Sequence, residues 1–272
     1  MTIQAEKCTR CGICAEACYL DAIDLETKTI DASRCMRCGH CMAYCPAGAV
    51  RQPGAEPPVI GANPAAEQFV SLVRSRRSCR NFRDKPVSRE LLTSLLDTVR
   101  YAPTGSNTEG VTVSVLCSRQ SVKAVADAIF RFLNKLSKAA LILAPLLAVA
   151  LGPRRVGRAL KLRGSLAQYQ DGRDIITFQA PAILAFSAPR GTSTPEEDGV
   201  IWATTAVYHA ETLGLGTCWN GFVKYAAQYN GRIRRMLGVP KGNRLYSVVL
   251  LGWPKFKARS GVVRKEASVV WK

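Results

Sequence analysis

Eleven cysteines stand out in this chain of 272 residues, because eight of them form two runs with the same spacing. The runs are Cys8-x2-Cys11-x2-Cys14-x3-Cys18 and Cys35-x2-Cys38-x2-Cys41-x3-Cys45-Pro46. Regular clusters of thiols indicate metal binding rather than disulfides. Paired CxxC motifs also hold structural zinc, but a zinc ion needs only four ligands and rarely has a third cysteine two residues further on. The spacing therefore favours iron–sulfur clusters over zinc.

The two runs resemble those of bacterial two-cluster ferredoxins, in which the fourth cysteine of each run ligates the other cluster. The resemblance implies two [4Fe–4S] clusters, one held by Cys8, Cys11, Cys14 and Cys45 and the other by Cys35, Cys38, Cys41 and Cys18. Three closely spaced thiolates can wrap one face of a cuboidal cluster, and Gly12 and Gly39 let the backbone approach its sulfides. The other cysteines are interpreted as ordinary half-buried thiols. They are Cys79, Cys117 and Cys218.

A second group of chemically capable residues begins at Arg74, in the sequence Arg-Ser-Arg-Arg-Ser-Cys-Arg-Asn-Phe82. Arginine offers several donors in a fixed fork, so packed arginines beside a serine hydroxyl suit a phosphate group or an electron-rich ring edge. Three later segments carry glycine and polar residues at 102–110, 214–221 and 251–254. The glycines of 214–221 follow a predicted helix rather than a strand, so they do not indicate a nicotinamide-binding Rossmann motif.

Together and in this order, these segments resemble the nitroreductase family of FMN enzymes, and with the cysteine runs the chain resembles ferredoxin–nitroreductase fusions. That family carries FMN at the interface of a homodimer, and electrons leave through the flavin N5 atom. By position, the resemblance implies that the phosphate and the pyrimidine edge of FMN are held by Arg76, Arg77, Ser78 and Arg80. It implies that Asn107 lies near the ring. The loop over N5 would contain Trp219, Asn220 and Gly221, and a late basic phosphate contact would come from Arg264 with Lys265.

The proline- and glycine-rich segment 51–62 predicts a linker between a ferredoxin domain over 1–50 and an FMN domain over 63–272. Capping residues and apolar spacing predict helices over 63–74, from Ser88 to before Pro103, and over 198–213. Strands are predicted at 111–116, 182–186 and 245–251. Helices that separate short strands indicate a layered α+β domain, and the resemblance implies the α/β/α layers of nitroreductases.

The formal charge of +18 is unevenly distributed. Residues 1–50 hold five Lys or Arg and six Asp or Glu, a balance of −1, so residues 51–272 carry +19. A basic surface attracts nucleic acid, acidic membranes, or anionic substrates and partners. Zinc-finger spacing and RNP-like aromatic motifs are missing from the sequence, and aromatic residues make up only 7% of it, so nucleic-acid binding is not expected.

Between Asp127 and Asp171 there is no acidic residue, and basic residues surround the apolar run Ala139–Leu151. They are Arg131, Lys135, Lys138, Arg154, Arg155, Arg158, Lys161 and Arg163. Four interpretations stay open: a lid favouring anionic substrates, a docking surface for an acidic electron donor, a membrane-surface helix pair, and a core helix with a solvated basic face. The run contains Pro145 and is shorter than the roughly 20 residues of a membrane-spanning helix. With no secretory signal at the N-terminus, a cytoplasmic location is expected.

These features predict an oxidoreductase in which two clusters feed FMN, and FMN reduces a small organic acceptor. Nitro compounds, quinones and activated alkenes are the candidate acceptors, and a ferredoxin-like protein or NAD(P)H is the candidate donor. No catalytic acid is evident, so protons are expected from solvent. The alternative is an electron carrier that serves a protein partner. A flavin face that is closed to small molecules would distinguish this carrier from an enzyme.

Overall fold

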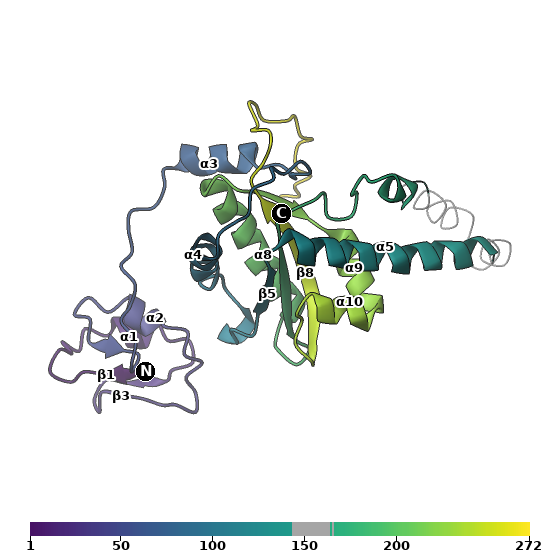
Figure 1. The fold of residues 1–272 in the computed structure, drawn as a ribbon. Coiled ribbons are helices and arrows are strands. Elements are labelled where there is room, and N and C mark those ends of the chain that lie inside the picture. The colour runs from purple at the N-terminus through teal and green to yellow at the C-terminus, as the bar shows by residue number, and fades with distance from the viewer. Residues whose placement is uncertain (143–163, 165) are drawn as a thin grey trace. The chain divides into compact units, whose positions relative to one another are not determined.

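The computed structural model describes residues 1–142, 164 and 166–272 of the chain. These residues divide into two compact units, Met1–Pro64 and Ala65–Lys272, and Figure 1 follows the chain through both. The predicted linker lies just before this division, and residues 52–65 form no helix or strand.

The first unit is built from very short elements. In chain order they are β1 (Thr2–Ile3), α1 (Ile13–Glu16), β2 (Ile23–Asp24), β3 (Thr29–Ile30), α2 (His40–Ala43) and β4 (Val50–Arg51). β1 pairs with β4 and β2 pairs with β3, both antiparallel. Because Arg51 belongs to β4, the first unit extends past the predicted domain end at residue 50.

The two cysteine runs fold into the same local structure. Helix α1 begins after Gly12, where φ is +87°, and α2 begins after Gly39, where φ is +78°. Glycine adopts this left-handed conformation at little energetic cost, because it has no Cβ atom. The repeated spacing of the sequence therefore corresponds to a repeated turn and helix.

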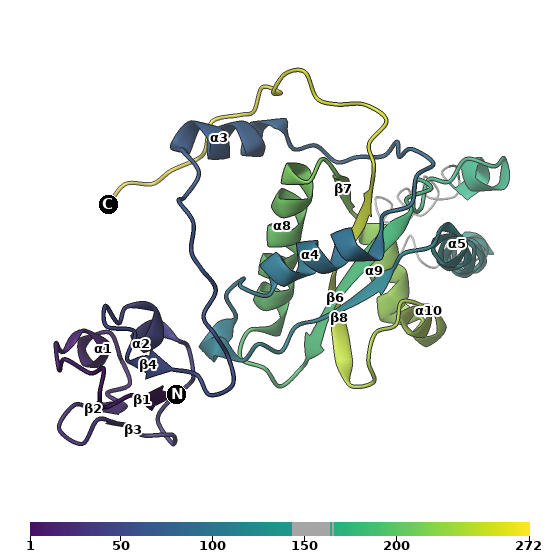
Figure 2. The ribbon, with the colours of Figure 1, turned by 60° about the vertical axis from the view of Figure 1, so that its left-hand side comes forward.

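The second unit is a four-stranded sheet with helices on both faces, as Figure 2 shows. Its elements are α3 (Ala66–Ser75), α4 (Arg89–Val99), the 3-10 helix η1 (Gly105–Asn107), β5 (Thr112–Leu116), α5 (Arg119–Ile142), β6 (Ala182–Pro189), α8 (Pro195–Thr212), β7 (Gly216–Trp219), α9 (Gly221–Tyr229), α10 (Gly231–Met236) and β8 (Asn243–Gly252). The strand order is β5-β6-β8-β7, and every neighbouring pair is antiparallel.

The central strands β6 and β8 are buried on both faces. On β6, Ile183 packs in a core with residues of α5, α9 and α10, whereas Leu184 and Phe186 pack in a second core with α4 and α8. Alternate residues of a strand point to opposite faces, so a strand between two helix layers is apolar throughout. This arrangement confirms the predicted α+β fold and its three layers.

The predicted helices are present, with differences at their ends. Ser88 caps α4 as predicted, because its Oγ accepts a hydrogen bond from the Leu91 N–H at 3.2 Å. Helix α3 begins at Ala66 rather than after Asn63, because the Gln68 side chain accepts a hydrogen bond from the Ala65 N–H at 3.1 Å. The expectation that Asn63 caps this helix is therefore wrong.

The basic, acid-free stretch is described only in part. Arg131, Lys135 and Lys138 are exposed residues of α5, and the basic positions from 154 to 163 lie outside the described residues. Among the helices that the structure describes, none is long and apolar enough to cross a membrane.

Candidate functional site

The first unit brings the predicted ligands of one cluster around a single cavity. All four predicted ligands of the second set line it: Cys18, Cys35, Cys38 and Cys41. Apolar side chains such as Leu20, Ile23 and Ile30 form much of the remaining wall. Cys18 comes from the first run and the other three from the second, so the exchange of the fourth cysteine that the resemblance implies fits this geometry.

Three members of the other predicted set influence one another. Burial raises the pKa of the Cys14 thiol, and the neighbouring Cys45 and Cys8 raise it further. Burial raises the pKa of Cys41 too, with contributions from Cys35, Cys38 and Cys14. Coulomb interactions weaken with distance, so these contributions are consistent with Cys45 near the first run and with Cys14 near the second set.

Backbone N–H groups are directed at the sulfur atoms. The Ala49 N–H donates to the Cys45 Sγ at 3.2 Å, and the Arg37 N–H donates to the Cys35 Sγ at 3.4 Å. Burial raises the pKa of Cys45, but N–H groups from Ala49 and its neighbours outweigh it, and the pKa falls below its ordinary value. Hydrogen bonds of this kind favour a thiolate, which is the form that binds iron.

Within the described part of the chain, no three His, Cys, Asp or Glu side chains gather closely enough to hold a single metal ion. The second cysteine set instead lines a common cavity from both runs, which suits a larger group. We conclude that their donor type and arrangement fit cuboidal iron–sulfur clusters.

In the second unit, three segments that are distant in the sequence are joined by backbone hydrogen bonds. Ser78 forms a parallel bridge with Thr217 of β7, and the Cys79 N–H donates to the Thr217 carbonyl at 2.8 Å. On the other side, the Lys255 N–H donates to the Asn81 carbonyl at 2.9 Å. The arginine segment is therefore fixed between the edge strand β7 and the chain that follows β8.

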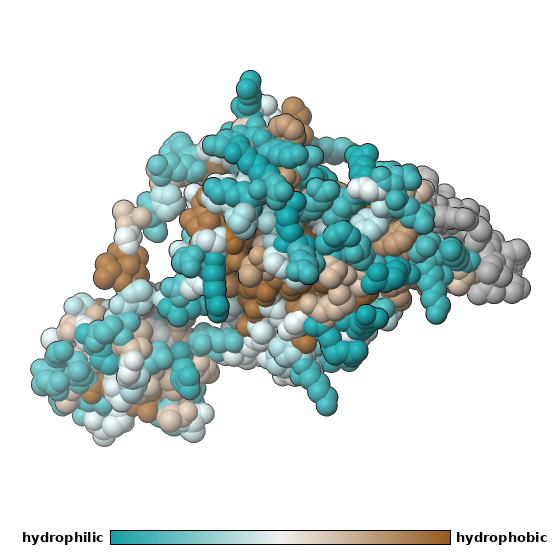
Figure 3. Space-filling view, in the orientation of Figure 1, coloured by the Kyte–Doolittle hydropathy of each residue, from teal (hydrophilic) through white to brown (hydrophobic). Residues whose placement is uncertain are grey.

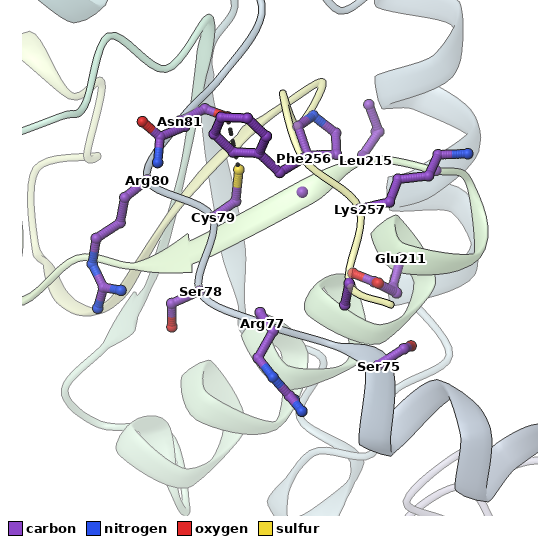
Figure 4. A pocket seen from close by; sticks show the side chains of 14 residues that line it. Ser75, Arg77, Ser78, Cys79, Arg80, Asn81, Glu211, Leu215, Phe256 and Lys257 are labelled. Carbon is purple, nitrogen blue, oxygen red and sulfur yellow. Dashed lines mark hydrogen bonds between the residues drawn. The ribbon is translucent and has the colours of Figure 1, made fainter. Parts of the chain in front are cut away.

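This junction borders a cavity of about 480 Å³. Figure 4 shows Arg77, Ser78 and Arg80 along one part of its wall, with Lys257 and Glu211 opposite. Arg76 does not line the cavity, but its charge acts on Glu211. The wall thus combines several cationic residues with a hydroxyl, which are groups that bind phosphate, although the charged ends of Arg77, Arg80 and Lys257 point in different directions in Figure 4.

Glu211 and Lys257 are site residues that the sequence interpretation missed. Burial raises the pKa of the Glu211 carboxyl, and the nearby Arg76 and Arg77 only partly oppose this. A usable signal was the position of Glu211 near the end of a predicted helix, directly before the glycine-rich segment 214–221. Lys257 could not be identified from the sequence, because its place in the site depends on the contact between residues 253–255 and the arginine segment.

A second cavity of about 460 Å³ adjoins the same segment, because Arg80 lines both. The junction between β7 and α9 lines it through Trp219, Asn220 and Gly221. The aromatic residues Phe178, Phe222 and Tyr225 form much of the remaining wall. The Arg80 guanidinium carbon lies 5.9 Å from the centre of the Phe178 ring.

The Asn220 side chain is committed to local structure. Its Oδ1 accepts from the Val223 N–H at 2.9 Å and caps α9, and its Nδ2 donates to the Ile176 carbonyl at 2.6 Å. Its backbone is engaged as well, because its N–H donates to the Val248 carbonyl at 2.9 Å and its carbonyl accepts from the Lys224 N–H at 3.3 Å.

Other predicted contacts lie elsewhere. Asn107 belongs to η1, and the Gly105 N–H of η1 donates a hydrogen bond to Asp198 at the start of α8. Glu211, which lines the cationic cavity, lies near the other end of that helix. Asp198 and Glu211 lie 13 residues apart on this helix, which is about 20 Å, so Asn107 does not reach the cavity beside Glu211 in its own chain. Arg264 and Lys265 are exposed in the C-terminal segment, which passes beside α3 in Figure 2, and neither lines a described cavity.

The three cysteines outside the runs differ in burial. Cys218 is buried and Cys79 half-buried, and burial raises the pKa of both. Cys117 is exposed rather than half-buried.

Comparison with known proteins identifies both parts of the chain. Residues 73–253 match the model of the nitroreductase family, and residues 7–49 match the model of a 4Fe-4S dicluster domain. The chain belongs to the nitroreductase family, and the N-terminal match confirms the predicted ferredoxin–nitroreductase fusion. No curated protein is similar enough to this chain to count as a relative.

Solved structures share the fold of the second unit. A nitroreductase from Bacteroides fragilis with bound FMN is 16% identical, with 75% of this chain and 99% of that chain covered and a TM-score of 0.56. An FMN-bound nitroreductase from Desulfitobacterium hafniense is 18% identical, with coverage of 75% and 98% and a TM-score of 0.56. An iodotyrosine deiodinase bound to FMN and 3-iodo-L-tyrosine is 16% identical, with coverage of 75% and 98% and a TM-score of 0.53. At these identities the likeness is one of fold.

The exchange of fourth cysteines can be tested with Cys18→Ser. Although Cys18 belongs to the first run, its loss should remove the cluster of the second run and halve the iron and sulfide per chain, from about eight atoms of each to about four. Cys38→Ser alone should give the same result. The double variant Cys18→Ser/Cys38→Ser should still keep about four iron and four sulfide atoms, because both cysteines ligate the same cluster, whereas it would lose both clusters if Cys18 ligated the cluster of its own run. Cys79→Ser should change nothing. Iron and acid-labile sulfide would be measured after anaerobic purification. Loss of metal in Cys79→Ser, or none in Cys18→Ser, would contradict the assignment.

The raised pKa of Glu211 predicts a pH dependence of stability. Because the fold favours the protonated carboxyl, the stability is fully present below the ordinary glutamate pKa and falls as the pH rises through the raised value. Glu211→Gln should remove this fall, and Glu266→Gln in the exposed tail should not. Thermal unfolding of flavin-free protein, followed by tryptophan fluorescence, reports on the second unit, since all four tryptophans lie there. An unchanged pH profile in Glu211→Gln would refute the link.

Proposed function

We propose that this protein is an oxidoreductase in which two [4Fe–4S] clusters pass electrons through FMN to a small organic acceptor. The observation that carries the proposal is the cationic cavity beside Arg77, Ser78 and Lys257, which shares the lining residue Arg80 with an aromatic-walled cavity. FMN matches these two cavities, because it has a phosphate at one end and a flat aromatic ring at the other. The FMN-bound structures of the same fold support the choice of cofactor.

In this proposal Arg77, Ser78 and Lys257 hold the phosphate, and Arg76 adds to the positive potential there. Arg80 spans both cavities and faces the pyrimidine edge of the ring. When bound, FMN would supply the exchange between one-electron and two-electron chemistry. The protein supplies binding, orientation and charge.

The second cavity, where the flavin ring is proposed to bind, also offers aromatic side chains on which an acceptor could stack beside the ring. Trp219, Phe222 and Tyr225 offer flat apolar faces, which favour stacking with a planar molecule, such as a nitroaromatic or a quinone. Arg80 adds an attraction for acceptors that carry negative charge. Among the described residues that line this cavity there is no carboxylic acid or histidine, and we propose that protons come from solvent.

A homodimer completes the site in this proposal. Asn107 is separated from its own cavity by the length of α8, so its predicted flavin contact requires a second copy of the chain. Exposed apolar side chains offer a surface for that copy, and Figure 3 shows apolar surface in the region of α8. They are Phe69, Val70 and Val73 of α3 and Val200 and Ile201 of α8.

The alternative function, an electron carrier without a small substrate, predicts a closed flavin face. The open cavity beside Trp219 and Gly221 favours the enzyme. The electron donor is proposed to be a ferredoxin-like protein or NAD(P)H, and the location to be the cytoplasm.

The phosphate site can be tested with Lys257→Gln. The loss of one cationic donor should raise the Kd for FMN by about tenfold at low salt, and by less at high salt, because salt screens exposed charges. Lys255→Gln is the matched control, since Lys255 lies two residues away and outside the cavity lining. The Kd would be measured from the quenching of flavin fluorescence on binding. Equal effects of the two variants would place the phosphate elsewhere.

The enzymatic function is tested by turnover of the holoprotein. Anaerobic, photoreduced protein should be reoxidised repeatedly by a nitroaromatic or a quinone, and the reduced product should accumulate. Protein stripped of FMN but with its clusters intact should show no turnover, because the acceptor cavity then lacks its electron source. Absence of turnover with nitroaromatics, quinones and activated alkenes alike would favour the carrier function instead.

A further inference from the structure

The loop that carries Asn107 has a strained backbone. Three residues that are not glycine have left-handed φ angles, +52° at Ser106, +52° at Asn107 and +47° at Glu109. Side chains disfavour this region, so such conformations persist only where the surroundings impose them, and they are concentrated at ligand-binding sites. This loop, residues 105–109, therefore has to be held by something outside itself.

Asp198 is the group that holds it. Its Oδ1 accepts a hydrogen bond from the Gly105 N–H at 2.9 Å and a second from the Thr194 Oγ1 at 2.9 Å. Asp198 lies in the first turn of α8 and is only 1% exposed. A carboxylate acceptor strengthens both bonds, and the positive end of the helix dipole favours a negative charge there.

The loop packs closely against the residues at the start of α8. A Cβ on residue 105 would collide with the Thr194 side chain, so glycine is required. The Ser193 hydroxyl donates to the Ser106 hydroxyl at 3.0 Å, and the Glu109 N–H donates to the Thr104 Oγ1 at 3.0 Å. The loop is thus attached to α8 at two consecutive residues.

The other oxygen of Asp198 shows that this arrangement is not optimal for stability. Asp198 Oδ2 is buried and has no hydrogen-bond partner among the described residues. Burying an unpaired carboxylate oxygen destabilises a fold. The presence of a carboxylate at this position is therefore best explained by its Oδ1 atom. This atom orients the Gly105 peptide and the strained residues that follow it.

We propose that Asp198 is a positioning residue for flavin binding: it holds loop 105–109 in the conformation that presents Asn107, and so sets the affinity for FMN. The inference rests on the proposed function, in which Asn107 contacts the flavin. It adds a residue that the sequence interpretation did not assign to the site. Asp198 itself touches no ligand in this account.

The experiment compares full-length Asp198→Ala, Asp198→Asn and Glu197→Ala. Glu197 is the exposed neighbour in the same helical turn, so its variant controls for the loss of a carboxylate at the helix start. Asp198→Ala should speed amide hydrogen exchange at Gly105 by about tenfold and raise the Kd for FMN by about tenfold. Asp198→Asn keeps an acceptor oxygen and should restore most of both. Glu197→Ala should change neither.

A double variant separates positioning from general destabilisation. If Asp198 acts through the loop, Asp198→Ala should not weaken FMN binding further when Asn107→Ala is already present. An equal weakening in both backgrounds, or unchanged exchange at Gly105 in Asp198→Ala, would overturn the proposal. Should Asp198→Ala fail to fold, Gly105→Ala tests the same contact from the loop, and it should loosen the loop and weaken FMN binding.

The two proposals fail differently. If Asn107→Ala leaves FMN affinity unchanged, the flavin contact in the proposed function is refuted, while the exchange at Gly105 still decides whether Asp198 holds the loop. If Asn107→Ala weakens FMN binding but Asp198→Ala leaves the exchange unchanged, the flavin site stands and the role of Asp198 is refuted.

Discussion

The candidate flavin site depends on the backbone pairing that fixes the arginine segment against β7 and the chain after β8. Arginine side chains are long and flexible, so a basic run binds a phosphate well only when its backbone is held. The bridge from Ser78 to Thr217 and the bond from Lys255 to Asn81 provide this restraint. They also explain why three segments far apart in the sequence form one site.

The position of the site follows from the apolar core. Strands β6 and β8 are buried on both faces, so polar groups of the described residues collect where the sheet ends, beside β7 and at the two ends of α8. The C-terminal end of α8 meets the cationic cavity through Glu211, and its N-terminal end meets the Asn107 loop through Asp198. A single helix thus separates the two contributions that one chain makes in this proposal, one to its own flavin site and the other, through Asn107, to the flavin site of a second copy.

Local spacing was enough to predict some parts of the molecule and not others. The local structure of the cysteine runs depends on nearby residues, because Gly12 and Gly39 lie within a few residues of the thiols and adopt the left-handed turns before α1 and α2. The buried strands are evident from continuous apolar runs. β7 was missed, because its glycine-rich sequence forms a strand only by pairing with β8. Glu211, Lys257 and Asp198 were missed as well, since their roles depend on which distant segment the fold places beside them.

The bridge at Ser78 has a second effect, on the solubility of the protein. β7 forms one border of the antiparallel sheet, and a bare border strand offers unpaired N–H and carbonyl groups to other molecules. The arginine segment occupies part of this border with its own backbone and brings positive charges that repel another copy. The same few residues therefore shield the sheet from edge-to-edge aggregation, and substitutions that detach them are expected to promote it.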